Sequence, residues 1–336
     1  MNYKLIINKI ILDFFKKIYR SFKKKELKIQ RFRRHIIQIR KLIPELKINF
    51  RHIIEKYNNT YNLSINGANV VYPVWFMWWQ GEDQMPDIVK INFKNLKNQL
   101  NGNELILITS NSYSKYLQVP DYIIEKFHQG QITLTQFSDL LRVLLLSQKG
   151  GLWLDATIYV TKPLPKSFDF YYWTPKWKLS ITDYFKFPLW VGLWHNSNIP
   201  FLTITQCMGV WFSKPQNNLF LCLSDFWLEY WKNEYKNPYY WTTEVFLIAC
   251  MYGGIPQIKN LIDEVPLNNK YCFDLANIIN TTNEEKELNK FLNDTQFYYL
   301  SWKAKYCDID QNSNKLTLYG KLKDNPNYIS NLCANK

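Results

Sequence analysis

The stretch FSDLLRVLLLSQKGGLWLDATIYV, residues 137–160, constrains the fold more than any other part of the sequence. Its apolar run at residues 140–146 is interrupted only by Arg142, and a glycine pair follows at 150–151. Glycine is common just past the end of a helix, because it adopts the left-handed backbone conformation without steric cost. A second apolar run, residues 152–154, ends at Asp155. The pattern predicts a buried helix that is followed at once by a buried strand.

Strand and helix patterns alternate around this stretch. Apolar and aromatic runs predict strands at 70–79, 105–109 and 152–160, and amphipathic patterns predict helices within 86–100, 120–129 and 133–149. This alternation predicts an α/β fold, in which ligands bind beyond the carboxyl ends of the strands. The second half is less regular. It predicts helices within 217–235, 240–254 and 283–293, and a short strand-like tail at 315–323.

The net charge of +14 lies almost entirely in one segment. Residues 1–56 contain 17 Lys and Arg against 4 Asp and Glu, whereas residues 57–336 contain 25 against 24. We therefore expect a basic helical N-terminal extension at 1–56, a polar linker at 57–69 and a folded domain at 70–336. The nearly neutral domain argues against a nucleic-acid-binding protein, which needs a basic face on its folded part.

The extension begins with the pattern of a basic amphipathic helix. Apolar residues recur at helical spacing through residues 5–22, with five Lys and Arg among and just beyond them. Such a helix can lie on an anionic membrane surface, and it can also pack on the protein's own body or form a coiled-coil arm. The sequence has no apolar stretch of 18 residues, no signal-peptide pattern and no metal-ligand spacing among its six cysteines. We expect a cytoplasmic protein that is peripheral at the inner face of the cell membrane.

Three charged residues stand out against the apolar stretch. Asp139 and Arg142 are three residues apart, so they share one face of the predicted helix. They form either a simple ion pair within the helix or part of a ligand site. Asp155 ends a strand beside the small residues of the Ala156-Thr157 pair, where a carboxylate either caps the strand or holds a divalent cation, Mn²⁺ or Mg²⁺.

Three segments carry a resemblance to a known family. They are VWFMWWQGEDQMPDIVK at 74–90, FSDLLRVLLLSQKGGLWLDATIYVTKPLP at 137–165 and FYYLSWKAKY at 297–306. Together they resemble the capsular polysaccharide synthesis glycosyltransferases, relatives of sugar-transferring enzymes with a DXD motif, and the resemblance spans residues 70–305. It implies a GT-A-type (Rossmann-like) domain, a nucleotide-sugar donor and a divalent cation.

The resemblance also implies roles for particular residues. Asp139 and Arg142 match a helix that faces the nucleotide-sugar, and Asp155 matches the first Asp of the DXD motif as a catalytic and metal-binding residue. Thr157 stands where that motif has its second carboxylate. Donor contacts to the base and ribose are expected from three residues near the end of the first strand: Trp75, Trp79 and Gln80.

Removing a proton from the acceptor hydroxyl requires a base. Glu244, in the aromatic-rich segment YYWTTEVFL, is the main candidate, and it can also be read as an ordinary acid at a helix start. Asp183, in LSITDYF, and Asp225, in SDFWLEYW, are weaker candidates.

We expect a glycosyltransferase that acts on a growing or lipid-linked capsular or surface polysaccharide. The alternative is a non-catalytic glycan-binding subunit of a polysaccharide assembly complex, which the replacement of the second DXD carboxylate by Thr157 keeps open. A nucleic-acid-binding protein is the least favoured class.

Overall fold

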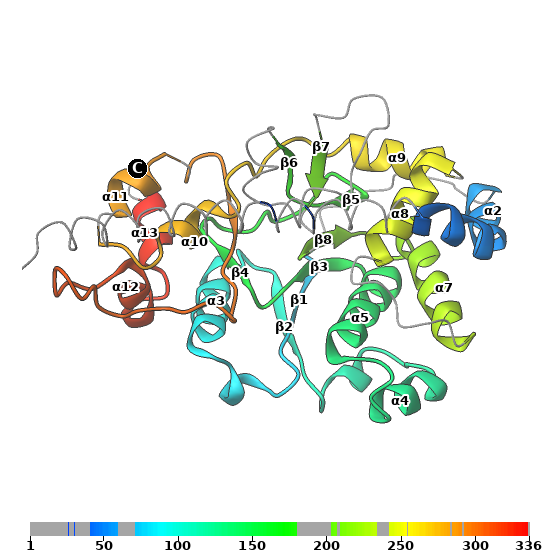
Figure 1. The fold of residues 1–336 in the computed structure, drawn as a ribbon, viewed down its shortest axis with the longest axis horizontal. Helices are drawn as coiled ribbons and strands as arrows, with labels where there is room; N and C mark the ends of the chain where they lie inside the picture. Colours follow the sequence, from blue (N-terminus) through cyan, green and yellow to red (C-terminus); the bar gives the residue numbers. More distant parts are fainter. Residues whose placement is uncertain are drawn as a thin grey trace, which may run out of the picture.

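The computed structural model describes residues 26, 30, 41–59, 71–179, 203–206, 209–233, 242–253, 255–282, 284–290 and 292–334. Its centre is a five-stranded sheet with the order β2-β1-β3-β8-β5 (Figure 1). The strands are β1 (Pro73–Met77), β2 (Glu104–Ile108), β3 (Gly151–Leu154), β5 (Tyr172–Trp173) and β8 (Val210–Ser213). β2, β1 and β3 run parallel, β8 pairs antiparallel with β3, and β5 pairs antiparallel with β8. The predicted α/β fold is therefore confirmed. The three parallel strands have their carboxyl ends at the same edge of the sheet, and this is the edge at which a ligand site was expected.

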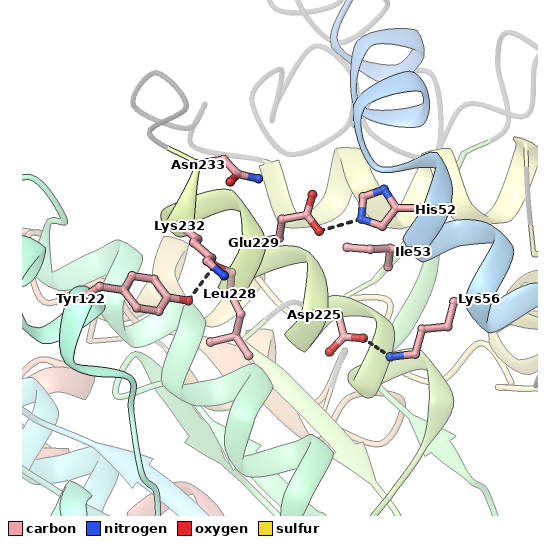
Figure 2. Close-up of a pocket in the computed structure, with 9 residues that line it drawn as sticks. All are labelled: His52, Ile53, Lys56, Tyr122, Asp225, Leu228, Glu229, Lys232 and Asn233. Carbon is pink, nitrogen blue, oxygen red and sulfur yellow. Dashed lines mark hydrogen bonds and ion pairs between the residues drawn. The ribbon is translucent and has the colours of Figure 1, made fainter.

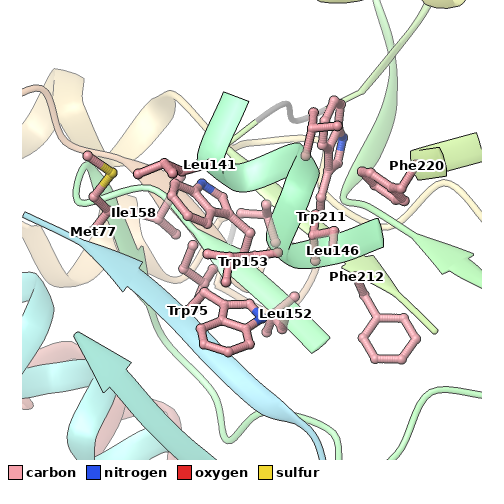
Figure 3. Close-up of a cluster of buried hydrophobic side chains, with 14 of the residues drawn as sticks. Trp75, Met77, Leu141, Leu146, Leu152, Trp153, Ile158, Trp211, Phe212 and Phe220 are labelled. Atoms are coloured by element: carbon pink, nitrogen blue, oxygen red, sulfur yellow. The ribbon is translucent and has the colours of Figure 1, made fainter. Parts of the chain in front are cut away.

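Residues 137–160 form the buried helix and the buried strand that their sequence predicts. Thr133 caps the helix α5 (Leu134–Gln148) by accepting from the Gln136 backbone N–H, while the Gln136 side chain accepts from the Thr133 N–H. Two left-handed glycines follow the helix, and the chain then enters β3. All four residues of β3 are buried, as are Leu141 and Leu146 of the helix (Figure 3). Burial of this apolar surface drives the helix onto the sheet.

Helices lie on both sides of the sheet. On one side are α3 (Asp87–Gln99), α10 (Asp274–Ile278), α12 (Leu318–Asp324) and α13 (Tyr328–Ala334), and on the other are α4 (Asp121–His128), α5 and α7 (Asn218–Lys232) (Figure 1). α7 packs along α5 and also contacts α2 (Arg51–Asn59) and α8 (Thr242–Gly253), and α8 packs on α9 (Pro256–Asp263). α11 (Glu284–Leu288) follows α10. Among the residues described, no helix is both long and apolar enough to cross a membrane.

Two short antiparallel ladders complete the sheet structure. β6 (Lys176–Leu179) pairs with β7 (Thr203–Gln206), and β4 (Ile158–Val160) pairs with β9 (Phe297–Tyr299). Because β4 starts three residues after Asp155, its pairing with β9 brings the third segment of the family resemblance to that turn.

The end of the basic extension packs on the domain. α2 is an amphipathic helix whose apolar residues Ile53, Ile54 and Tyr57 are buried, and Phe50 just before it packs edge-on against Phe226 of α7. Lys56 pairs with Asp225 of α7 at 2.7 Å. The helix continues to Asn59, into the segment predicted as a linker. Residues 1–25, which contain the whole of the amphipathic helix predicted through residues 5–22, lie outside the described residues.

The strand-like tail predicted at 315–323 is wrong. Leu316 makes one isolated bridge to Ile309, and the chain then turns into α12. The Thr317 hydroxyl accepts a hydrogen bond from the Gly320 N–H at 3.1 Å and so caps this helix. The alternating pattern of the tail predicted a strand, but the cap and the burial of Leu318 and Leu322 on one helical face decide the local structure.

Gly151→Ala is expected to destabilise the protein strongly. Gly151 has φ +97°, and an added Cβ would lie 2.4 Å from the Pro73 carbonyl oxygen, at the start of β1. Strained backbone costs about 1–3 kcal/mol, and the clash adds to it, so we expect Tm to fall by several degrees in thermal denaturation. Gly102→Ala is the matched control, since Gly102 has φ +92° with nothing within 4 Å of an added Cβ. Equal losses in the two variants would show that the contact with β1 does not matter.

Candidate active site

Asp155 lies directly beyond β3, at the carboxyl edge of the three parallel strands. Its backbone N–H donates to the Gly209 carbonyl at 2.8 Å, and its Oδ1 accepts from Trp153 Nε1 at 2.7 Å. Asn92, buried on α3, donates its side-chain amide to the next carbonyl, that of Ala156, at 2.9 Å. These bonds fix the turn that carries Asp155, while 34% of its side chain remains exposed.

Arg142 joins Asp155 to Asp139. Its guanidinium, with only 8% of the side chain exposed, forms an ion pair with the Asp139 carboxylate one turn away on α5. Its Nη1 also lies 3.5 Å from Asp155 Oδ1. The predicted intrahelical pair is therefore present, but it is one half of a larger arrangement in which two carboxylates share one cation.

Two indole rings hold the guanidinium in place. The Cζ atom of Arg142 lies 5.1 Å from the ring centre of Trp211 and 5.8 Å from that of Trp153. These rings are direct cross-strand partners on β8 and β3, and both are buried (Figure 3). Attraction between a cation and an aromatic face stabilises such an arrangement. The positive charge is thus fixed before any ligand arrives.

Asp139 titrates unusually for an aspartate. Burial, opposed by the Arg142 cation and reinforced by the Asp155 carboxylate, raises the pKa of Asp139 from 3.8 to about 6. The folded state therefore binds more protons than the unfolded state between about pH 4 and 6. It follows that the contribution of this carboxyl to the free energy of unfolding falls as the pH rises through that window.

This shift predicts a difference between the wild type and Asp139→Asn. The wild type should lose Tm relative to the variant as the pH rises from 4 to 6, and the difference should level off above the pKa of about 6. Thermal denaturation at half-unit steps measures this difference, and Asp263→Asn, which breaks an exposed ion pair with Lys259, is the control. A flat difference across the window would mean that Asp139 titrates normally.

Gly209 and Tyr299 complete the surroundings of Asp155, and sequence reasoning missed both. The Gly209 N–H donates to the Tyr299 phenol oxygen at 3.1 Å, and its carbonyl accepts from Asp155. A Cβ on Gly209 would lie 2.7 Å from that phenol oxygen and 2.8 Å from Asp155 Oδ2. The missing side chain leaves room for the two oxygens to converge. The only sequence signal was the placing of Tyr299 in FYYLSWKAKY.

The predicted donor-binding residues at the first strand divide into two groups. Trp75 is only 2% exposed, and its indole N–H donates to the Gly150 carbonyl at 2.8 Å, so its side chain belongs to the core and supports the glycine turn. Trp79 lies just past the strand end, half-buried, with Tyr113, Phe127 and Phe137 around its ring. Gln80 is exposed beside it. The strand end therefore offers Trp79 and Gln80 to a ligand, and does not offer Trp75.

A second aromatic pair lies at the same strand end. The rings of Trp78 and Trp302 meet edge to face with their centres 6.0 Å apart, and Trp302 is 45% exposed. Trp302 follows β9 by three residues, so the pairing of β9 with β4 places it near the site. Exposed indole faces of this kind are suited to stacking against a sugar ring or a base.

Of the candidate bases, the structure describes the side chain of Asp225 alone, which lies between α2 and α7, and Asp183 lies outside the described residues. The backbone of Glu244 lies in the first turn of α8, and its side chain is outside the described residues. Asp225 lines a separate hollow of about 540 Å³ between α2, α4 and α7 (Figure 2). There it pairs with Lys56, while Glu229 pairs with His52 at 2.7 Å. These two ion pairs hold α2 against α7, so the role of Asp225 in this structure is to join the two helices.

The chain is similar to known proteins in two comparisons. The family described as "Capsular polysaccharide synthesis protein" matches residues 13–322. The chain belongs to the capsular polysaccharide synthesis family. Among solved structures, a chain titled "PaToxG Glycosyltransferase" aligns at 12% identity with a TM-score of 0.40, over 88% of this chain and 98% of that one. A search of the curated proteins gives no match.

The charged groups of this capsular polysaccharide synthesis protein set a limit on how it can hold a metal ion. Within the described part of the chain, no three His, Cys, Asp or Glu side chains lie together in a way that could hold a metal ion. Asp155 Oδ1 is engaged by Trp153 and Arg142, and Oδ2 is the oxygen that lies against the bare Cα face of Gly209. A single carboxylate oxygen fits a hard divalent cation that is held mainly by the phosphates of a substrate.

Proposed function

We propose that this protein is a glycosyltransferase with a GT-A-type domain. It would transfer a sugar, most simply a hexosyl group, from a nucleotide-sugar donor to a growing or lipid-linked capsular or surface polysaccharide. The observation that carries the proposal is the Asp139–Arg142–Asp155 arrangement at the carboxyl edge of the parallel strands. Membership in the capsular polysaccharide synthesis family supports the class of acceptor.

The chemistry of transfer explains why a fixed cation belongs at this edge. The bond between the anomeric carbon and the diphosphate breaks, and negative charge develops on the leaving phosphate oxygen. Arg142 is already oriented by two carboxylates and two indole rings, so it stabilises this charge without reorganising during the reaction. Asp139 keeps the guanidinium in place and can accept hydrogen bonds from hydroxyl groups of the donor.

We further propose that Asp155 Oδ2 holds a divalent cation, Mn²⁺ or Mg²⁺, together with the donor's phosphates. When bound, such a cation neutralises charge on the leaving diphosphate. Trp79, Gln80 and the Trp78–Trp302 pair are proposed to contact the base, the ribose or the sugar. Glu244 remains the proposed base that takes the acceptor's proton.

Thermal shift of the full-length protein tests the proposal most directly. UDP-, GDP- and CDP-sugars are each added with and without Mn²⁺ to the wild type and to Asp155→Asn. We expect one nucleotide class to raise the Tm of the wild type only with metal, and the variant to lose that increase. Stabilisation that is equal with and without Mn²⁺ would contradict the proposed cation at Asp155.

The alternative function is a non-catalytic glycan-binding subunit, and Thr157 in place of the second DXD carboxylate is the feature that favours it. It predicts that the nucleotide-sugars leave Tm unchanged. It also predicts that a capsular oligosaccharide raises Tm equally in the wild type and in Asp155→Asn.

We propose that the basic N-terminal extension holds the protein peripherally at the cytoplasmic face of the cell membrane, near a lipid-linked acceptor. Its charge of +13 and the near neutrality of the remainder support an anionic surface as partner, rather than a nucleic acid. Co-sedimentation of the full chain with phosphatidylglycerol vesicles should be strong at low salt and weak at high salt. Equal binding to neutral phosphatidylcholine vesicles would contradict an electrostatic attachment.

A further inference from the structure

The two indole rings beside Arg142 use their N–H groups differently. Trp153 donates its N–H to Asp155 Oδ1 at 2.7 Å, so this side chain serves the carboxylate as well as the cation. The Nε1 atom of Trp211 is buried and has no hydrogen-bond partner among the described residues. A buried tryptophan N–H usually finds a partner, and one that does not lowers the stability of the fold. A phenylalanine of similar shape would avoid this cost.

The face of the Trp211 ring is occupied by the guanidinium. Arg142 Cζ lies 5.1 Å from the centre of this ring, nearer than to the ring of Trp153 at 5.8 Å. Among aromatic side chains, the indole attracts a cation most strongly, and the attraction grows when the cation is removed from water. Only 8% of the Arg142 side chain is exposed, so this condition is met. The tryptophan thus supplies an attraction that a phenylalanine would supply more weakly.

Trp211 is itself held from two sides. It is the strand partner of Trp153 in the pairing of β8 with β3, and Phe220 of α7 packs edge-on against its ring with the centres 5.3 Å apart. Both Trp211 and Phe220 are fully buried (Figure 3). The indole cannot turn without displacing these neighbours, so it gives the guanidinium a fixed surface to lie on.

We propose that Trp211 is a positioning residue for sugar transfer, whose indole face fixes the Arg142 guanidinium in the orientation that meets the leaving diphosphate. This role rests on the proposed function, and it gives β8, a strand distant in the sequence from Arg142, a part in stabilising the leaving group. Trp211 acts through the guanidinium and does not touch the substrate. Its loss should therefore lower kcat and leave the KM of the donor nearly unchanged.

Trp231 provides a matched control on α7. Its Nε1 is likewise buried without a partner among the residues that the structure describes, and its ring stacks on that of Trp227 with the centres 6.0 Å apart. Along α7, Trp231 follows Phe220 by eleven residues, which is about 16 Å of helix. A substitution at Trp231 removes the same atoms and the same unpaired N–H as one at Trp211, at a distance from the guanidinium.

The test measures steady-state transfer and Tm of the full-length protein, with UDP-, GDP- and CDP-sugars as donors in Mn²⁺ and a capsular oligosaccharide as acceptor. Trp211→Leu should lower kcat by roughly 30-fold, the rate equivalent of about 2 kcal/mol for a desolvated contact between a cation and an aromatic face. Trp211→Phe keeps a weaker aromatic face and should lose less. Trp231→Leu and Trp231→Phe should change Tm and keep the kcat of the wild type.

The kcat values distinguish positioning from packing. If the wild type transfers sugar and both Trp211 variants keep its kcat, Trp211 has no part in positioning, and the proposed function stands without it. Equal losses of kcat at Trp211 and Trp231 would also overturn the role, because lost packing alone would explain them. A raised donor KM with an unchanged kcat would do the same. If the wild type transfers no sugar from any donor, the proposed function fails, and this role fails with it.

Discussion

Arg142→Gln is expected to abolish sugar transfer and to destabilise the fold at the same time. The substitution leaves Asp139 and Asp155 facing each other without the cation that they share. Removing one partner of a buried ion pair typically costs about 3–5 kcal/mol, because the remaining charge is left without compensation. Loss of a preorganised charge at the leaving group lowers kcat by about 10²–10³-fold. Urea denaturation and steady-state transfer assays measure the two effects separately.

Two further variants test whether the loss of the shared cation causes both the instability and the loss of transfer. Arg142→Lys keeps the charge but not the planar fork that reaches two carboxylates and lies between two indoles, so it should fold better than Arg142→Gln and remain impaired in transfer. Arg51→Gln breaks an exposed helix pair with Glu55 at 2.7 Å, and should change the free energy of unfolding by less than about 0.5 kcal/mol. If Arg142→Gln were as stable and active as Arg51→Gln, the shared cation would have neither role.

Asp155→Asn should lower kcat by at least about 100-fold while leaving the fold nearly intact. The amide oxygen of asparagine can still accept the Trp153 indole N–H, and the backbone bond to Gly209 is unaffected. What the variant loses is the negative charge at the position of Oδ2. Transfer assays over a range of Mn²⁺ concentrations, together with Tm, distinguish this loss from unfolding.

Asp225→Asn is the matched control for that experiment. Asp225 also pairs with a lysine and a tyrosine, at 2.7 and 2.9 Å, but it lies at the contact between α2 and α7. It should affect Tm and leave kcat unchanged. Normal transfer by Asp155→Asn at every Mn²⁺ concentration would remove Asp155 from the chemistry and favour the glycan-binding alternative.

The local patterns of the sequence predict much of the fold and the centre of the site. The apolar run around Arg142, the glycine pair and the strand ending at Asp155 indicate α5 and β3 correctly, since cap chemistry and hydrophobic periodicity act over short distances. Asp139, Arg142 and Asp155 lie within 17 residues of one another, so the same short-range patterns bring them together.

The remainder depends on contacts between distant segments. Trp75 and Trp79 look alike in the sequence, but Trp75 lies within β1, where residues 74–77 are all buried, and Trp79 lies past the end of that strand. Gly209 and Tyr299 join the site through the pairing of β8 with β3 and of β9 with β4, and no short-range pattern specifies which distant strand pairs with which. The partners of Asp225 likewise come from α2, nearly 170 residues earlier in the chain.

The pairing of β9 with β4 has a consequence for biosynthesis. Asp139, Arg142 and Asp155 are synthesised before half of the 336 residues have been made, whereas Tyr299 is made when little remains. Until then, β4 lacks its strand partner and the turn at Asp155 lacks the bond from Leu300. The strands of the central sheet are therefore all made before the site is complete. A fragment that ends before β9 would leave the apolar strand β4 without its partner.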